Sequence, residues 1–254
     1  MGIARRIALV LGLLVAVAPT LAEAGRRPFI WAYDTEIVPE GDVELEQWLW
    51  ARGRAPAAPN VPARYWIWWS PVIGLSSNLE LAFPFQLFGG SGQGAGIDSF
   101  EVDLRYRLLP RESQSRFQPL IRLDYHQGIG SPSRVDANLV GSYDFGQGLH
   151  ATLDLGGRLA LPVLSGQLTA PATLVGSYDL GLAYALPGSE LKIAAELFGE
   201  VGLMNASFQH HFVGPSVSWS RGRLWLTAGT LVGLTPLFPQ TPQFMPRLIC
   251  GIAL

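Results

Sequence analysis

The sequence lacks long apolar runs beyond its first two dozen residues. Hydrophobic residues make up 48 % of the 254 residues, and the mean hydropathy is +0.24. Yet after Ala24 no run reaches the roughly 18 consecutive apolar residues that a membrane-spanning helix needs. No such helix is therefore expected there, and the apolar residues must follow another pattern.

Cysteine and charge are also scarce. Cys250 is the single cysteine, which excludes an internal disulfide framework. Charged residues account for only 15 % of the chain, and 18 Lys and Arg nearly balance 20 Asp and Glu. Nucleic-acid binding proteins concentrate basic residues on one surface. The sequence has no such basic patch, so a nucleic-acid partner is not expected.

The first 24 residues have the features of a cleaved signal peptide. Arg5 and Arg6 precede an apolar run over residues 7–18, and residues 22–24 (AEA) have the small-x-small pattern of a cleavage site. A membrane anchor is the alternative, but the run is too short to span about 30 Å of hydrocarbon. Residues 1–24 are therefore predicted to be removed, and residues 25–41 then form an N-terminal segment, either periplasmic or luminal.

What the rest of the sequence does contain is strict alternation. Along Ser99–Leu108, polar residues occupy one parity and apolar residues the other: Phe100, Val102, Leu104, Tyr106 and Leu108 against Ser99, Glu101, Asp103, Arg105 and Arg107. Residues 77–87 and 149–161 show the same period of two. Successive side chains of a β-strand point to opposite faces, whereas a helix has a period of 3.6. The pattern predicts strands, each with one apolar and one polar face.

The spacing of these stretches predicts an all-β protein. Twelve strands are predicted over residues 42–52, 64–75, 78–88, 98–109, 117–127, 134–145, 149–161, 173–186, 190–201, 210–220, 223–234 and 244–254. Gaps rich in Gly, Pro and Ser alternate with mostly short gaps. This is typical of a transmembrane antiparallel up-and-down β-barrel with short periplasmic turns and longer extracellular loops. Residues 42–254 are thus predicted to form a barrel of about 12 strands in a bacterial outer membrane, in contact with its lipid.

One hexapeptide, LVGSYD, occurs at residues 139–144 and again at 174–179. The interval corresponds to two strands and two connections, so both copies are predicted on strands that run toward a periplasmic turn. Tyr143 and Tyr178 have the lipid-facing parity, and Tyr106 and Trp219 are expected at a similar depth. Tyr and Trp are favoured at the membrane–water interface, because the ring is apolar and the polar group reaches water.

The entry into the first strand carries a resemblance. Residues 33–50 (YDTEIVPEGDVELEQWLW) resemble the opening of a group of small Gram-negative porin-like outer-membrane barrels, with the matching positions Thr35, Glu36, Pro39, Gly41, Glu44 and Glu46. Some members of that group are labelled as transporters linked to phenol degradation. The resemblance implies a barrel inserted by the barrel-assembly machinery. Such barrels usually end in an aromatic residue, whereas this chain ends in Leu254, although Leu248, Cys250 and Ile252 keep the alternation.

Parity also predicts which residues face the lumen. The expected pore-lining set is Glu44, Glu46, Trp48, Trp50, Arg52, Glu101, Asp103, Arg105, Arg107, Arg122, Asp124, Asp136, Asp154 and Arg158. Later strands point small residues inward instead, including Gly181, Ala183 and Gly229. A charged wall facing a wall of small residues favours a narrow water-filled channel for passive diffusion of small solutes. The alternative is a lumen plugged by paired charges.

Tryptophans introduce a second alternative. Trp48 and Trp50 share the inward parity of Glu46, near the outer mouth, while the parity of Trp66 and Trp68 is ambiguous. A luminal aromatic group would guide an apolar or aromatic solute. Aromatic residues at this depth also form the lipid-facing girdle of many barrels.

Enzymatic and metal functions find little support. Outer-membrane phospholipases are also twelve-stranded and use a Ser–His pair, but none of the four histidines stands in a recognisable motif with serine. His126 and His150 are predicted to face the lumen. His210 and His211 are adjacent, so they point to opposite faces and are a poor metal site. We therefore expect no catalytic, metal or cofactor site, and the runner-up function is a non-conducting structural or receptor barrel that acts through its loops.

Overall fold

The computed structural model describes residues 27–60, 63–90, 93–110, 113, 115–129, 132–161, 173–204 and 208–254. The predicted signal peptide, residues 1–24, lies outside these residues. Within the described part of the chain, no helix is long and apolar enough to cross a membrane.

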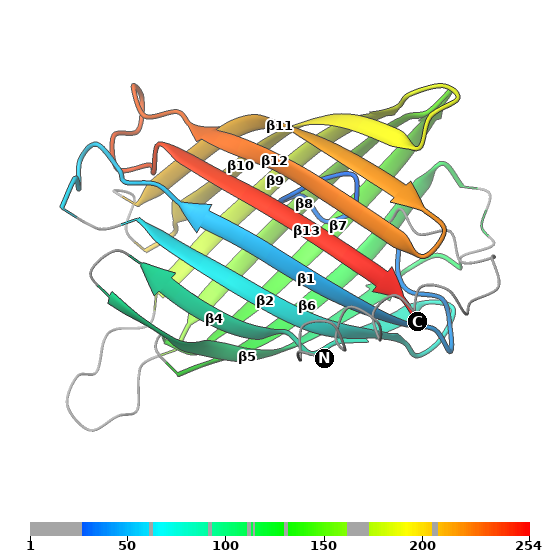
Figure 1. Ribbon diagram of the computed structural model, residues 1–254, viewed down its shortest axis with the longest axis horizontal. Coiled ribbons are helices and arrows are strands. Elements are labelled where there is room, and N and C mark those ends of the chain that lie inside the picture. The colour runs from blue at the N-terminus through cyan, green and yellow to red at the C-terminus, as the bar shows by residue number, and fades with distance from the viewer. Residues whose placement is uncertain are drawn as a thin grey trace, which may run out of the picture.

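Antiparallel strands form a closed wall (Figure 1). The strands are β1 Val43–Arg52, β2 Arg64–Gly74, β3 Leu79–Ala82, β4 Phe85–Gly90, β5 Gln93–Arg107, β6 Phe117–Gly128, β7 Arg134–Gly146, β8 Leu149–Ala160, β9 Thr173–Ala185, β10 Leu191–Gly202, β11 Gln209–Arg221, β12 Leu224–Gly233 and β13 Phe244–Ala253. The sheet closes because β1 pairs with both β2 and β13. The predicted twelve-stranded antiparallel barrel is confirmed, with β3 and β4 sharing one strand position.

The third strand position is where the prediction needs correction. A single strand was expected over 78–88, but β3 and β4 are separated at Phe83 and Pro84, and both pair with β2. Proline has no backbone N–H to donate to a neighbouring strand. In addition, β5 begins at Gln93 rather than near residue 98 and forms a hairpin with β4. Much of the predicted Gly-rich loop is therefore strand.

The two faces of the wall have opposite chemistry. On β5, Phe100 and Val102 expose 49 % and 43 % of their surface outward, whereas Glu101 and Asp103 expose only 4 % and 6 %. Other strands repeat this arrangement: on β8, Leu153 and Leu155 are exposed, whereas Thr152 and Asp154 are buried. An apolar outside and a polar inside is the inverse of a water-soluble sandwich and suits a barrel surrounded by lipid.

The two ends of the barrel differ in their connections. One end, called here the short-turn end, carries the turns after β2, β5, β7, β9 and β11, together with the start of β1 and the end of β13. The turn from β7 to β8 needs three residues with positive φ, namely Gly146, Gln147 and Gly148. Glycine tolerates this conformation without steric cost. The opposite end, the long-loop end, carries the remaining connections.

Residues 27–42, which precede β1, are called here the luminal segment, and most of them lie inside the ring of strands (blue in Figure 1). Phe29, Ile30, Ile37 and Val38 on this segment are almost fully buried. Ile37 packs on Leu120 and Val140 from the wall. Of the two placements considered for residues 25–41, the described part therefore occupies the lumen.

Candidate functional site

The luminal segment is held in place by buried polar groups of the wall. On β10, the Glu196 carboxylate accepts backbone hydrogen bonds from Ile30 at 2.8 Å, Trp31 at 2.8 Å and Ala32 at 3.2 Å. On β13, Arg247 donates to the Ile30 carbonyl at 2.6 Å. An irregular segment has no strand partner for its backbone groups, and buried unpaired groups are costly. Glu196 and Arg247 satisfy three N–H groups and one carbonyl.

A second anchor lies further along the segment. Arg105 on β5 donates to the backbone carbonyls of Asp34 at 2.5 Å and Glu36 at 2.9 Å. Its other nitrogen forms an ion pair with Glu80 on β3 at 2.8 Å. Glu80 in turn accepts the backbone N–H of Val38. Both residues of this ion pair, Arg105 and Glu80, therefore hydrogen-bond the backbone of the luminal segment.

Asp34 is the acidic group of the luminal segment. Its carboxylate accepts a hydrogen bond from the Ser142 hydroxyl at 2.7 Å and lies 3.1 Å from Nε2 of His150. Burial alone raises the pKa of this carboxyl, but the contacts with His150 and Ser142 outweigh it and hold the pKa below its usual value. Asp34 is therefore ionised at neutral pH.

The room beside the wall of small residues is not empty, as the prediction had it, because the luminal segment occupies it. At Gly181 on β9, an added Cβ would meet the ring of Phe29 at 2.5 Å, and at Gly229 on β12 it would meet Ile30 at 2.9 Å. The room created by small inward residues is thus filled by the chain's own luminal segment. Close packing requires such filling, because an empty apolar void forfeits contacts.

Beyond the luminal segment, toward the long-loop end, the lumen contains a cavity of about 800 Å³. Trp31 and Tyr33 of the segment form part of its lining, and Arg52, Arg64 and Pro242 line it beside the long loops. Burial raises the pKa of the Tyr33 hydroxyl to about 12, so the ring stays neutral. The Arg122 guanidinium lies 4.1 Å from the centre of that ring.

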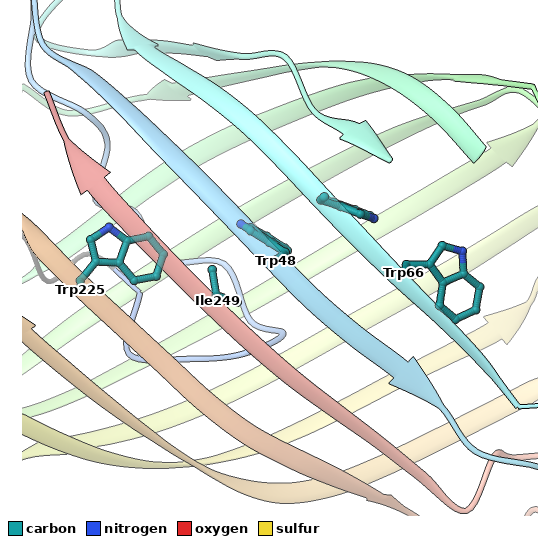
Figure 2. Close-up of a cluster of buried hydrophobic side chains, with 5 residues drawn as sticks. Trp48, Trp66, Trp225 and Ile249 are labelled. Carbon is teal, nitrogen blue, oxygen red and sulfur yellow. The ribbon is translucent and has the colours of Figure 1, made fainter. Parts of the chain in front are cut away.

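One side of the cavity is aromatic. Trp48 stacks on Trp68 with ring centroids 5.2 Å apart, and Trp50 stacks on Trp66 at 3.9 Å. Figure 2 shows Trp48 and Trp66 with Trp225 and Ile249, which come from the neighbouring strands β1, β2, β12 and β13. The ambiguous pair Trp66 and Trp68 thus faces the lumen, together with Trp48 and Trp50, and these four rings are not part of a lipid-facing girdle.

The opposite side carries a chain of ion pairs. Arg134 bonds Asp136 at 3.1 Å, Asp136 bonds Arg158 at 2.6 Å, and Arg158 bonds Glu200 at 2.8 Å. Separately, Arg122 bonds Asp103 at 3.0 Å. Charges with little exposure are tolerated when they are paired in this way. The cavity therefore lies between stacked indoles and a band of guanidinium and carboxylate groups.

The structure divides the predicted pore-lining residues into two groups. Eight line the cavity: Trp48, Trp50, Arg52, Arg122, Asp124, Asp136, Asp154 and Arg158. The other six lie inside the wall but away from the cavity lining: Glu44, Glu46, Glu101, Asp103, Arg105 and Arg107. Most of these bond to the luminal segment or to a neighbour, as Glu46 does to Arg27 and Glu101 does to His126.

The four predicted interface aromatics also divide. Tyr106, Tyr143 and Trp219 lie within a few residues of the short-turn end. Tyr178 lies further from that end. Tyr143 pairs with Ala151 on β8, and Ala151 pairs with Leu182 on β9. Leu182 is four residues closer to the short turn than Tyr178, so Tyr178 is deeper in its strand than Tyr143 is. The ring of Tyr178 instead covers Gly199, and its hydroxyl lies 2.8 Å from Nδ1 of His211. The two hexapeptides therefore differ in depth, contrary to the prediction.

Sequence reasoning did not identify several cavity residues. Phe198, Glu200, Phe212 and Arg247 all line the cavity, as does Asp179, whose inward parity the sequence did indicate. Phe198 and Glu200 share one parity of β10, and alternation on that strand was the available signal. Trp31 was not identifiable, because parity says nothing about an irregular segment.

Comparisons with known proteins identify structures of similar fold but assign the chain to no protein family. A scan against models of protein families finds no match, and a search of curated proteins finds none either.

Solved structures of similar fold include outer-membrane channels. An outer-membrane channel from Pseudomonas putida F1 superposes with a TM-score of 0.59 at 12 % identity, covering 87 % of this chain and 98 % of that one. The NanC porin gives 0.59 at 9 % identity over 84 % of this chain and 100 % of that one. The KdgM porin gives 0.55 at 10 % identity over 83 % and 99 %. The chain has the fold of these channels.

Proposed function

We propose that this protein conducts small solutes across a bacterial outer membrane by passive diffusion. The cavity between the tryptophans and the ion pairs forms the outer half of the path. The luminal segment narrows the inner half. Outer-membrane lipid and the barrel-assembly machinery are the proposed partners.

The observation that carries this proposal is the cavity itself. A structural barrel of this size needs only side chains that fill its interior. Here about 800 Å³ stays open in the lumen, beside charged groups such as Arg158 and Asp136. Charged groups around a narrow lumen select solutes by charge and size. The lining therefore supports a selective path for small polar or amphipathic solutes.

One observation favours the competing function, a non-conducting structural or receptor barrel. The luminal segment fills the lumen beside Gly181 and Gly229, and Glu196 and Arg105 hold it with buried hydrogen bonds. A segment that never moved would close the path. Conductance separates the two functions directly.

Single-channel conductance of the refolded protein in a planar lipid bilayer is the test. Arg105 and Arg107 lie on the same strand with the same inward parity and similar burial, but Arg105 bonds the luminal segment and Arg107 bonds Gln118. Arg105→Ala removes two hydrogen bonds to the luminal segment and is expected to loosen it. The conductance steps should then increase about twofold or more, because the path becomes wider and the free energy of an ion in a narrow path depends steeply on the local field.

Arg107→Ala is the matched control and is expected to change conductance less. Equal effects of the two substitutions would mean that the segment does not limit the current. Absence of steps from a wild-type barrel shown to be folded and inserted would leave the non-conducting function.

A further inference from the structure

We propose that the lumen contains a subsite for an organic cation, in which Asp154 and Asp179 bind the ammonium group and the rings of Phe198 and Trp31 contact its apolar body. This inference names a solute class for the proposed channel and rests on that function. The subsite lies within the cavity, since all four residues line it.

The strand register brings the four wall residues of this region into one row. Asp154 on β8 pairs with Asp179 on β9, Asp179 pairs with Phe198 on β10, and Phe198 pairs with Phe212 on β11. Directly opposed residues of neighbouring strands have side chains close together on the same face. Two carboxylates are therefore followed by two aromatic rings along a single luminal row.

The two carboxylates differ from three other acids of the cavity. Asp136, Glu200 and Asp124 each form an ion pair with arginine. Asp154 and Asp179 expose only 1 % and 7 % of their surface, and their Oδ2 and Oδ1 atoms respectively have no hydrogen-bond partner within the described residues. Oδ1 of Asp154 accepts one bond from Asn138 at 2.7 Å. Adjacent buried carboxylates repel one another, so a cation bound between them is strongly favoured.

The neighbouring arginine does not serve as that cation. Arg247 donates to the Ile30 carbonyl at 2.6 Å, and its guanidinium lies 3.4 Å from the ring centre of Trp31. Its position is thus fixed by the luminal segment, and it forms no ion pair with either carboxylate among the described residues. Both carboxylates line the cavity without a cationic partner among the described residues.

The aromatic half of the subsite fixes the type of cation. Phe198 stacks on Trp31 with ring centroids 5.2 Å apart and planes at 9°, and it also stacks on Phe212 at 5.9 Å. An ammonium carrying an aromatic or alkyl group combines attraction to the carboxylates with contact to these rings. A hydrated metal ion would gain nothing from the rings, and an anion would be repelled by the carboxylates.

A competing state exists in which the two carboxylates share one proton and need no cation. That state would give no preference for a charged solute. Comparison of charged and neutral probes of one shape therefore distinguishes the two.

Isothermal titration calorimetry of the refolded, full-length mature barrel in detergent tests the subsite, with benzylamine, benzyl alcohol and benzoate as probes. We expect benzylamine to bind at least about tenfold more tightly than the other two, as a charge-assisted hydrogen bond predicts. Asp179→Asn and Asp154→Asn, made separately, should each weaken benzylamine binding about tenfold. The control is Asp144→Asn, since Asp144 has the same place in the first LVGSYD but is exposed beside the short turn.

Equal binding of benzylamine and benzyl alcohol, or unchanged binding in both site variants, would overturn the proposal. An equal loss in Asp144→Asn would show a general charge effect and would overturn it as well. Conductance in KCl is measured on the same preparations. A barrel that conducts but does not bind benzylamine refutes the subsite alone, whereas one that binds benzylamine without conducting refutes the channel function.

Discussion

At the scale of single residues, a few buried carboxylates determine how the lumen is filled. Glu196 gathers three backbone N–H groups of the luminal segment, Glu80 accepts a fourth, and Asp34 is itself part of that segment. Glu196 and Glu80 thus replace the hydrogen bonds that a neighbouring strand would otherwise supply to these N–H groups. These polar contacts act together with the apolar packing of Phe29, Ile30 and Ile37 to hold the segment in the lumen.

Acid should loosen the luminal segment through Asp34. Because the pKa of Asp34 is depressed in the folded protein, its stabilising contacts are complete above the ordinary value of 3.8 and are lost as the pH falls through the lower folded value. We expect the conductance of the wild type to rise as the pH falls through this lower value, by more than that of Asp34→Asn. At pH 7, Asp34→Asn should lower the free energy of unfolding by about 1–3 kcal/mol.

Bilayer recordings between pH 7 and pH 3 provide the measurement. Other luminal carboxylates also protonate in this range, so the difference between the two proteins is the informative quantity. Identical pH profiles would show that Asp34 has no role in holding the segment.

Residue orientation was largely predictable from parity. Arg122, Asp136 and Arg158 all face inward, as alternation indicated. Their partners were not predictable, because Arg158 reaches Glu200 across an intervening strand. Alternation specifies a face, but only the closed barrel brings these side chains together.

At the scale of the elements, the strands were predictable to within a few residues because the lipid-facing and luminal faces differ so strongly in chemistry. The exceptions have local causes. Pro84 interrupts the third strand since it has no N–H, and the β4–β5 hairpin extends through glycines that give no alternation signal. The depth of Tyr178 was mispredicted because identical hexapeptides were assumed to lie at equal distances from their turns.

That difference in depth predicts unequal effects on stability. Tyr178 covers Gly199 and bonds His211, whereas Tyr143 contacts Phe145 at the short-turn end. Tyr178→Ala should reduce the free energy of unfolding by about 1–2 kcal/mol, because it removes both a cross-strand contact and a hydrogen bond. Tyr143→Ala should cost less.

Urea-dependent unfolding in lipid vesicles measures both variants. Tyr178→Phe keeps the ring and removes the hydroxyl, so it separates the two contributions. A larger loss for Tyr143→Ala than for Tyr178→Ala would contradict this account of the outer face.

At the scale of the whole molecule, the barrel encloses its own N-terminal segment. The sequence left open whether residues 25–41 lie in the periplasm or the lumen, because the segment has no periodicity and its contacts are remote in sequence. The Ile30 N–H, for example, meets Glu196, 166 positions away. The small residues that receive Phe29 and Ile30 are visible in the sequence, but what fills the space beside them is not.

The central claim is that solutes pass through the lumen and that the luminal segment limits their passage. The most direct measurement is single-channel conductance of the protein expressed without residues 1–24 beside a variant that also lacks residues 27–41, each verified as a folded barrel by heat-modifiable gel mobility. The account predicts discrete steps for both, with steps about twofold or more larger in the shortened variant, as a wider water-filled lumen requires. Steps of equal size would show that the segment does not limit the path, and no steps in either protein would contradict the channel function itself.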